Sequence, residues 1–258
     1  MNLAGLKKMH ASGEKIAVLT CYDASFAALM AQAGVDMLLV GDSLGMVLQG
    51  ARNTLGVTMQ DMVYHTRCVA AGASSALIMA DMPYESDLTP ELALANARQL
   101  MAAGAHVVKL EGNKADVVRH LVAQGIPVCG HLGFTPQSVH QLGGYKVQGR
   151  DATSAQQIRN DAALLQQAGA SLLLLEMVPA SLAQQITRDL DIPTIGIGAG
   201  IDCSGQVLVL HDMLGIYPGK TPKFARNFMQ GAASIQQAVA NYVAAIKSGE
   251  FPGPEHSF

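Results

Sequence analysis

The sequence predicts a (β/α)₈ barrel, a TIM barrel of the α/β class, because strand-like and helix-like stretches alternate along its 258 residues. Five times, a helix-like stretch ends in glycine and a short apolar run follows within a few positions. Parallel strands that helices cover on both faces are expected to be such near-continuous apolar runs. Eight apolar runs in a chain of about 250 residues are typical of this barrel.

The eight apolar runs are the predicted strands. In chain order they cover residues 16–23, 36–43, 76–83, 106–112, 127–133, 171–178, 193–200 and 206–213. A doubly wound sheet is the alternative, but it usually has fewer strands and a glycine-rich turn after the first, where this chain has "TCYDASF". Because no linker rich in proline or serine interrupts the chain, we predict a single domain over residues 1–258.

Recognisable residues begin and end the intervening helices. Thr58 and Asp61 have the spacing of a capping box, and Thr89 precedes a proline at the first helical position. We expect a glycine in the left-handed conformation just past the C-terminus of five helices. These glycines are Gly34, Gly72, Gly104, Gly125 and Gly169.

Three segments lie outside the repeat. An N-terminal extension precedes the first strand. Residues 135–154 form a long, polar, glycine-containing connection after the fifth strand, and we expect them to act as an active-site lid. A C-terminal helix over "AASIQQAVANYVAAIKSG" is followed by the tail "EFPGPEHSF", a candidate contact with a neighbouring subunit.

Composition excludes several classes of function. Half of the residues are hydrophobic and 14% are charged, as in a well-packed enzyme rather than a disordered chain. The net charge of −3, with no basic cluster beyond Lys7 and Lys8, argues against a nucleic-acid or anionic-membrane partner. Without a signal-peptide pattern or an apolar run of about 18 residues, we expect a soluble cytoplasmic protein. The cysteines are widely spaced and are expected to be small buried residues rather than disulfides or a zinc site: Cys21, Cys68, Cys129 and Cys203.

Polar side chains follow the apolar runs directly, at the strand ends where such barrels place their active sites. They are Asp23, Asp42 with Ser43, Asp81, Lys109 with Glu111, His131, Glu176, and His211 with Asp212. Loops often begin with aspartate, but this tendency accounts for only one or two of these carboxylates. We therefore interpret them as a functional acidic site.

A divalent cation suits this group of carboxylates. Asp42, Asp81 and Glu111 follow three consecutive strands, so we expect them to lie side by side, where they would repel one another without a cation. An oxygen-rich set without clustered histidine or cysteine favours Mg²⁺, with water and substrate completing its coordination. Lys109 either neutralises a substrate carboxylate or forms an ion pair that balances Asp81 or Glu111.

Most of the remaining candidate site residues have two possible interpretations. Glu176 follows four leucines, which should raise its pKa toward that of a general base, although a lysine or arginine from a helix is an alternative partner. His131 is either a substrate contact or a structural histidine. Residues 196–200, "GIGAG", either cradle an anion or form a tight turn. His211 and Asp212 are a candidate pair that orient each other.

Several motifs together resemble the 3-methyl-2-oxobutanoate (ketopantoate) hydroxymethyltransferase family. They are "GDSLGMVLQG", "ADMPY", "VKLEG", "VCGHLGFTPQSVHQLGGYKVQGR", "LLLLEMVP", "IGIGAG", "VLHDMLGI" and "EHSF", and the resemblance covers essentially the whole chain. It implies a (β/α)₈ barrel that assembles as a homodecamer, a pentamer of dimers. It also implies Mg²⁺-dependent hydroxymethyl transfer from 5,10-methylenetetrahydrofolate to 3-methyl-2-oxobutanoate, which forms 2-dehydropantoate for pantothenate and coenzyme A biosynthesis.

The resemblance also implies a role for each matching residue. Metal ligation falls to Asp42, Asp81 and Glu111, the last directly or through water. Substrate contacts fall to Asp42, Ser43, Asp81, Lys109 and His131, with Ser43 and Lys109 on the substrate carboxylate. Glu176 becomes the proton acceptor. The residues that contact the folate stay unassigned, including those in "QGARNTLGVT".

Two other functions remain open at this point. A Mg²⁺-dependent lyase or mutase acting on phosphoenolpyruvate or isocitrate would use a similar barrel and an enolate. It would usually require a basic or cysteine-containing loop, and residues 135–154 carry Lys146 and Arg150 but no cysteine. A metal- or ligand-binding scaffold without activity would be favoured by loss of Glu176 or Lys109, and both are present.

Overall fold

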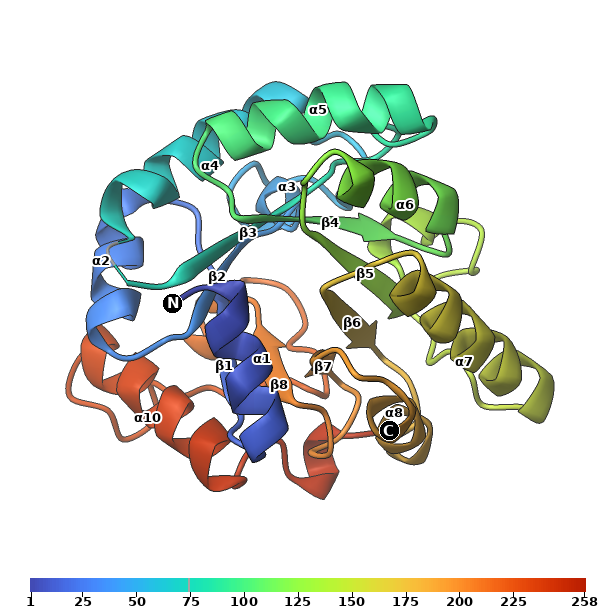
Figure 1. Cartoon of the computed structure of the whole chain (residues 1–258). Coiled ribbons are helices and arrows are strands. Elements are labelled where there is room, and N and C mark those ends of the chain that lie inside the picture. Colours follow the sequence, from blue (N-terminus) through green and yellow to red (C-terminus); the bar gives the residue numbers. More distant parts are fainter. Residues whose placement is uncertain (74) are drawn as a thin grey trace.

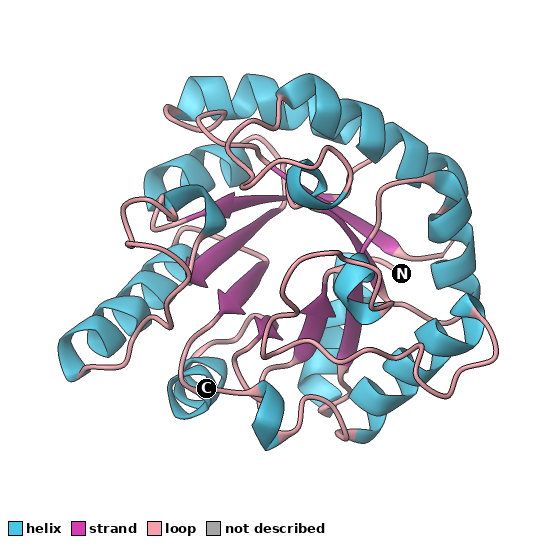
Figure 2. Ribbon diagram, turned by 180° about the vertical axis from the view of Figure 1, so that it is seen from behind, coloured by secondary structure: helices cyan, strands magenta, loops and turns pink. Residues whose placement is uncertain are grey.

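The computed structural model is a closed barrel of eight parallel strands surrounded by helices (Figures 1 and 2). It describes residues 1–73 and 75–258. Each strand pairs with the next and the last pairs with the first, which closes the sheet. The strands are β1 (Ile16–Thr20), β2 (Met37–Val40), β3 (Leu77–Asp81), β4 (Val107–Glu111), β5 (Val128–Gly133), β6 (Leu172–Glu176), β7 (Thr194–Ile197) and β8 (Gly205–Leu208). All eight predicted strands are confirmed.

The helices lie around the barrel and at its two ends (Figures 1 and 2). They are α1 (Leu3–Ser12), α2 (Ala24–Gln32), α3 (Leu44–Val47), α4 (Met59–Gly72), α5 (Pro90–Ala102), α6 (Ala115–Ala123), α7 (Ala152–Gln167), α8 (Ala180–Asp189), α9 (Leu210–Met213) and α10 (Ile235–Ser248), with 3₁₀ turns η1 (Pro136–Ser138) and η2 (Pro254–His256). No helix among the described residues is long and apolar enough to cross a membrane.

Helix caps agree with the sequence pattern. The Thr58 side chain accepts a hydrogen bond from the backbone N–H of Asp61, whose carboxylate accepts one from the N–H of Thr58. Thr89 caps α5 with proline at its first position. The predicted left-handed glycines are confirmed at four of the five positions, with positive φ at Gly34, Gly104, Gly125 and Gly169.

Gly72 is the exception among these glycines. It is the last residue of α4 and has no left-handed φ. A Cβ atom at this position would overlap the carbonyl oxygen of Ala24, at the start of α2. The prediction that Gly72 follows a helix in the left-handed conformation was therefore wrong. This glycine instead allows two helices to approach closely.

The last two strands depart from the expected repeat. Residues 198–204 join β7 to β8, and the described chain has no helix there. A seven-residue turn suffices because both strands have only four residues and β8 begins opposite Ile195. The predicted strand 206–213 ends at Leu208, so His211 and Asp212 lie on α9 instead.

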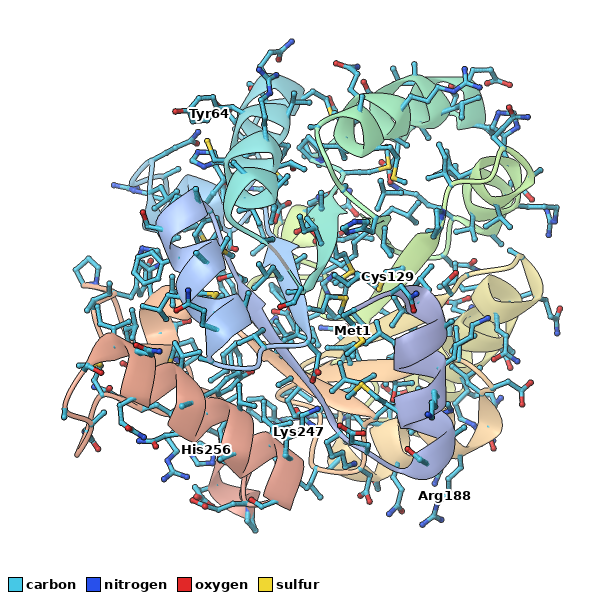
Figure 3. All side chains as sticks on the ribbon, turned by 60° about the vertical axis from the view of Figure 1, so that its left-hand side comes forward. Met1, Tyr64, Cys129, Arg188, Lys247 and His256 are labelled. Atoms are coloured by element: carbon cyan, nitrogen blue, oxygen red, sulfur yellow. The ribbon has the colours of Figure 1, made fainter. Side chains whose placement is uncertain are left out.

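Both ends of the chain pack against the barrel. On α1, Leu6 is fully buried, and His10 hydrogen-bonds Ser204 just before β8 begins. Lys247 of α10 (Figure 3) forms ion pairs with Asp36 at 2.7 Å and Glu14 at 3.1 Å. Contact of the C-terminal tail with a neighbouring subunit stays a prediction.

Part of the C-terminal tail packs on the tail's own chain. The carbonyl oxygen of Phe258 accepts a hydrogen bond from the N–H of Ala180 at 2.8 Å.

The cysteines are all free, and Cys21, Cys129 and Cys203 are buried as predicted, whereas Cys68 is only partly buried.

Candidate active site

A cavity of about 160 Å³ opens at the C-terminal ends of the strands. Its lining includes every metal, substrate and proton-transfer position that the family resemblance implies, together with several residues that were not predicted. These positions are Asp42, Ser43, Asp81, Lys109, Glu111, His131 and Glu176, and the lining also includes Asp212. Two other polar candidates lie outside this lining: His211, and Asp23, which caps α2 by accepting a hydrogen bond from the N–H of Phe26. Three larger hollows lie along α10, beside α6, and between α7 and α8, and none of them contains a comparable cluster of carboxylates.

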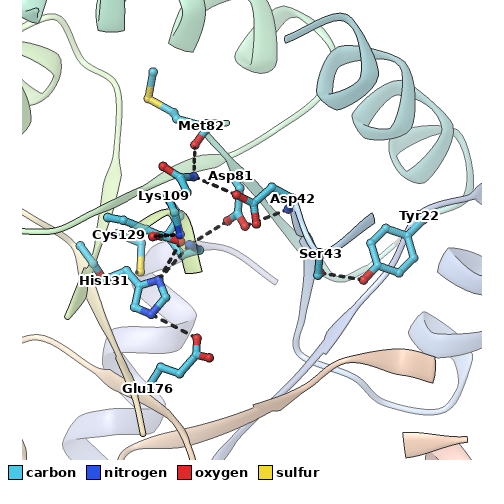
Figure 4. A network of polar contacts seen from close by, with 12 residues as sticks. Tyr22, Asp42, Ser43, Asp81, Met82, Lys109, Cys129, His131 and Glu176 are labelled. Atoms are coloured by element: carbon cyan, nitrogen blue, oxygen red, sulfur yellow. Dashed lines mark hydrogen bonds and ion pairs between the residues drawn. The ribbon is translucent and has the colours of Figure 1, made fainter. Parts of the chain in front are cut away.

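Lys109 lies at the centre of the polar cluster (Figure 4). Its ammonium is 3.1 Å from Oδ1 of Asp81 and donates to Nδ1 of His131 at 3.2 Å. Burial alone would lower the pKa of Lys109, but Asp81, Glu111 and Asp42 together raise it above its ordinary value. Lys109 is therefore charged, and the proposed ion pair with Asp81 is present.

The neighbouring carboxylates have more negative charge than one lysine can balance. Burial, followed by the charge of Asp81, raises the pKa of Asp42 to about 7. Burial is also the main cause that raises the pKa values of Asp81 and Glu111. The backbone N–H of Asp42 donates to Oδ2 of Asp81 at 3.1 Å, which holds these two side by side. A divalent cation would supply the missing positive charge.

The arrangement fits a metal at Asp42 and Asp81 better than at Glu111. Oδ1 of Asp81 is buried without a hydrogen bond and has only the Lys109 ammonium beside it. Glu111 instead accepts a hydrogen bond from the N–H of Gln137 at 2.9 Å and lies 3.6 Å from His131. In the described part of the chain, no three acidic, histidine or cysteine side chains converge as a ready ligand set. The metal-binding role of these residues thus stays a prediction.

Gln137 is a site residue that the sequence did not reveal. It is buried, and its side-chain amide donates to Oδ2 of Asp42 at 2.8 Å and to the carbonyl of Met82 at 3.0 Å. With its backbone N–H on Glu111, it ties the segment 135–154 to two of the carboxylates. Nothing in the pattern distinguishes it from the other glutamines of that polar segment.

Glu176 faces a histidine rather than a lysine or arginine. Its Oε2 lies 3.3 Å from Nε2 of His131, and burial raises the pKa of Glu176 to about 8. Burial and the charge of Lys109 lower the pKa of His131 well below its ordinary value, so this imidazole is neutral. Because Lys109 donates to Nδ1, the imidazole proton is on Nε2, which makes no hydrogen bond within the described residues although Oε2 of Glu176 lies 3.3 Å away.

The structure gives a different result for each of the other residues that the sequence analysis singled out. Ser43 shares a hydrogen bond of 2.9 Å with Tyr22, which was not predicted. No hydrogen bond or ion pair joins His211 to Asp212 in the described residues, so their pairing was wrong; His211 packs against the ring of Tyr22, at 5.8 Å between centroids. A Cβ at Gly198 would come within 3.0 Å of aromatic rings, which favours the tight turn over an anion cradle for "GIGAG".

Comparison with known proteins decides the family. The profile of the Ketopantoate hydroxymethyltransferase family matches residues 1–254. The chain belongs to this family. The 3-methyl-2-oxobutanoate hydroxymethyltransferase of Nitrosospira multiformis is 62% identical over 98% of this chain and 97% of its own length. That of Methylobacillus flagellatus is also 62% identical, over the full length of both chains. The predicted family is confirmed.

Solved structures show the same fold at much lower identity. Phosphonopyruvate hydrolase matches with a TM-score of 0.64 and 13% identity, over 83% of this chain and 84% of its own. 2,3-Dimethylmalate lyase, a member of the PEP mutase/isocitrate lyase superfamily, matches with a TM-score of 0.59 and 16% identity, over 83% of this chain and 79% of its own. These similarities concern the barrel alone. The full-length identity places the chain with the ketopantoate hydroxymethyltransferases instead.

Proposed function

We propose that this hydroxymethyltransferase moves a one-carbon unit from 5,10-methylenetetrahydrofolate to 3-methyl-2-oxobutanoate through a Mg²⁺-stabilised enolate. Water supplies the hydroxyl oxygen, and the products are 2-dehydropantoate and tetrahydrofolate. Membership of the ketopantoate hydroxymethyltransferase family supports the overall reaction, a step of pantothenate biosynthesis. The observation that carries the enolate is Glu176, a largely buried carboxylate with a pKa of about 8 that lines the same cavity as Asp42 and Asp81.

Asp42 and Asp81 are the residues that would hold the cation, and Glu111 would lie farther from it. When bound, a Mg²⁺ ion would act as a Lewis acid on the oxygens of the 2-oxo acid. Lys109 has three ammonium donors, of which Asp81 and His131 occupy two, so the third can bind the substrate carboxylate. Ser43 lines the cavity and can donate to the same carboxylate.

Glu176 is the proposed base that removes the C3 proton of the 2-oxo acid. A general base works best when its pKa is near the working pH, and burial has already moved that of Glu176 from 4.5 to about 8. The His131 imidazole lies beside this carboxylate, with Nε2 3.3 Å from Oε2 of Glu176. General base catalysis of this kind contributes roughly 10²–10⁴-fold to the rate.

The segment 135–154 is proposed as the lid that excludes water. Pro136 and Tyr145 line the cavity, and the ring of Tyr145 packs against buried Phe134 at 5.0 Å between centroids. Gln137 attaches this segment to Asp42 and Glu111. A closed segment would keep water from protonating the enolate before the carbon–carbon bond forms.

Assembly and location belong to the proposal as well. We propose a cytoplasmic homodecamer, on the strength of the family resemblance. Light scattering of the purified protein should then give ten times the mass of the 27.0 kDa chain.

Metal-dependent binding of the 2-oxo acid tests the site. Calorimetry should show that 3-methyl-2-oxobutanoate binds wild type with Mg²⁺ but not in EDTA, and that Asp42→Ala and Asp81→Ala lose this dependence. Asp23→Ala is the matched control, because Asp23 also follows a strand but lies outside the cavity lining. Equal affinity with Mg²⁺ and with EDTA would contradict the chelation proposal. A turnover assay with and without methylenetetrahydrofolate tests the overall reaction.

A further inference from the structure

Asp212 is a cavity carboxylate that the mechanism does not use. It lies on α9, directly after β8, with 8% of its surface exposed, and it lines the same cavity as Asp42 and Glu176. Within residues 1–73 and 75–258, no hydrogen bond or ion pair engages its side chain. Its carboxylate oxygens have no partner in the described chain and line the cavity, where a ligand that donates hydrogen bonds can reach them.

The wall around Asp212 differs from the metal side of the cavity. β8 lies between β7 and β1, across the barrel from β4 and Glu111. Pro222 and Phe224 line the cavity on this side. Their segment is held along α9 by a hydrogen bond of 2.8 Å from the N–H of Phe228 to the carbonyl of Met213. The cavity therefore offers a carboxylate and an aromatic face, away from Lys109.

These groups do not suit the 2-oxo acid. That substrate is an anion, and an additional carboxylate would repel it. The folate donor has a flat pterin ring with two adjacent donors, the ring N3–H and the 2-amino group. Two carboxylate oxygens match such a pair of donors, and an aromatic side chain packs well against a flat ring.

We propose that Asp212 and Phe224 form the subsite for the pterin ring of the folate co-substrate, with Asp212 accepting the two pterin donors. This inference rests on the proposed function, since it names the site of its second substrate. Pockets that hold drug-sized ligands usually measure about 300–1,000 Å³. The cavity of about 160 Å³ is smaller, so only the pterin end enters and the remainder of the folate lies beyond the mouth.

Asp212→Asn tests the subsite, because the amide keeps the size of the side chain but turns one acceptor into a donor. The KM for methylenetetrahydrofolate should rise by roughly 10- to 100-fold, as expected for losing hydrogen bonds to a charged group. C3 exchange of 3-methyl-2-oxobutanoate without folate should stay within about threefold of wild type. Phe224→Leu should raise the same KM by a smaller factor. Asp202→Asn, an exposed aspartate outside the cavity lining, is the matched control.

The results of these experiments distinguish a failure of the proposed pterin subsite from a failure of the proposed reaction. An unchanged KM for the folate, or a KM and an exchange rate that worsen together, would overturn the role of Asp212. Calorimetry with 5-formyltetrahydrofolate gives a readout without turnover, and Asp212→Asn should weaken this binding by a similar factor. If wild type showed no C3 exchange, the enolate proposal would fail, and this binding comparison would still decide whether Asp212 holds the pterin.

Discussion

Asp42, Asp81 and Glu111 are buried in one cavity with a single lysine lining it, and Glu176 adds a fourth carboxylate. Burying charge without full compensation is unfavourable, which is why the pKa values of all four are raised. Such a cluster stabilises the fold poorly, which is consistent with the proposed roles in binding and proton transfer. Selection for activity accounts for the cluster better than selection for stability does.

Glu176→Gln should stabilise the metal-free protein at high pH. The pKa of Glu176 is raised from 4.5 to about 8, so the folded state holds its proton more strongly than the unfolded state does. The stability that this proton gives is complete below about pH 4.5 and is lost as the pH rises through about 8. Urea denaturation at pH 5 and pH 9 should show that the variant exceeds wild type by an amount that grows with pH, to the order of a few kcal/mol.

Glu91→Gln is the control for that comparison, because Glu91 is exposed in the first turn of α5. It should not show the gain in stability with pH that is expected for Glu176→Gln. Parallel pH profiles for Glu176→Gln and wild type would show that the Glu176 carboxylate is not perturbed.

At the scale of elements, caps and glycines set where helices begin, end and meet. Residue pairs close in sequence, such as Thr58 and Asp61, are readable because both partners lie in one helical turn. The role of Gly72 is not readable, because its neighbour Ala24 belongs to another helix far away in the sequence. A local pattern thus predicts local conformation well and contacts between elements poorly.

Gly72→Ala should destabilise the protein more than an equivalent change elsewhere. Its Cβ would overlap the backbone of Ala24 and force α2 and α4 apart, a cost of about 1–3 kcal/mol in a packed region. Gly56→Ala is the matched control, since a Cβ there meets no neighbour within 4 Å and φ is not positive. Thermal unfolding should give a clearly lower Tm for Gly72→Ala. A Tm equal to that of the control would refute the close-approach role.

Gln137→Ala should release the segment 135–154. Three hydrogen bonds hold Gln137 to Asp42, Met82 and Glu111, and the variant loses the two that its side chain makes. Trypsin should then cleave faster after Lys146 and Arg150, both of which are exposed in this segment.

Gln141→Ala is the control for the lid experiment, because Gln141 is exposed in the same segment. It should be cleaved at the wild-type rate. The same rate for Gln137→Ala would mean that Gln137 does not anchor the segment.

At the scale of the whole molecule, the strand repeat predicted the barrel and the family motifs predicted the enzyme. The barrel topology brings strand ends together, so Asp42, Asp81 and Glu111 could be placed on one rim from their spacing alone. Gln137 and Tyr22 could not, because their partners lie on other elements and the residues themselves are of ordinary type. The extra turn after β8 that carries Asp212 was hidden for another reason: it continues the apolar run of the strand.

The central claim is that Glu176 removes the C3 proton of 3-methyl-2-oxobutanoate while a divalent cation stabilises the enolate. Deuterium exchange at C3, followed by proton NMR in D₂O with Mg²⁺ and without folate, measures that step alone. We predict rapid exchange by wild type, loss of exchange in EDTA, and a fall of at least about 10²-fold for Glu176→Gln with binding of the 2-oxo acid retained. Exchange by Glu176→Gln at the wild-type rate would contradict the account.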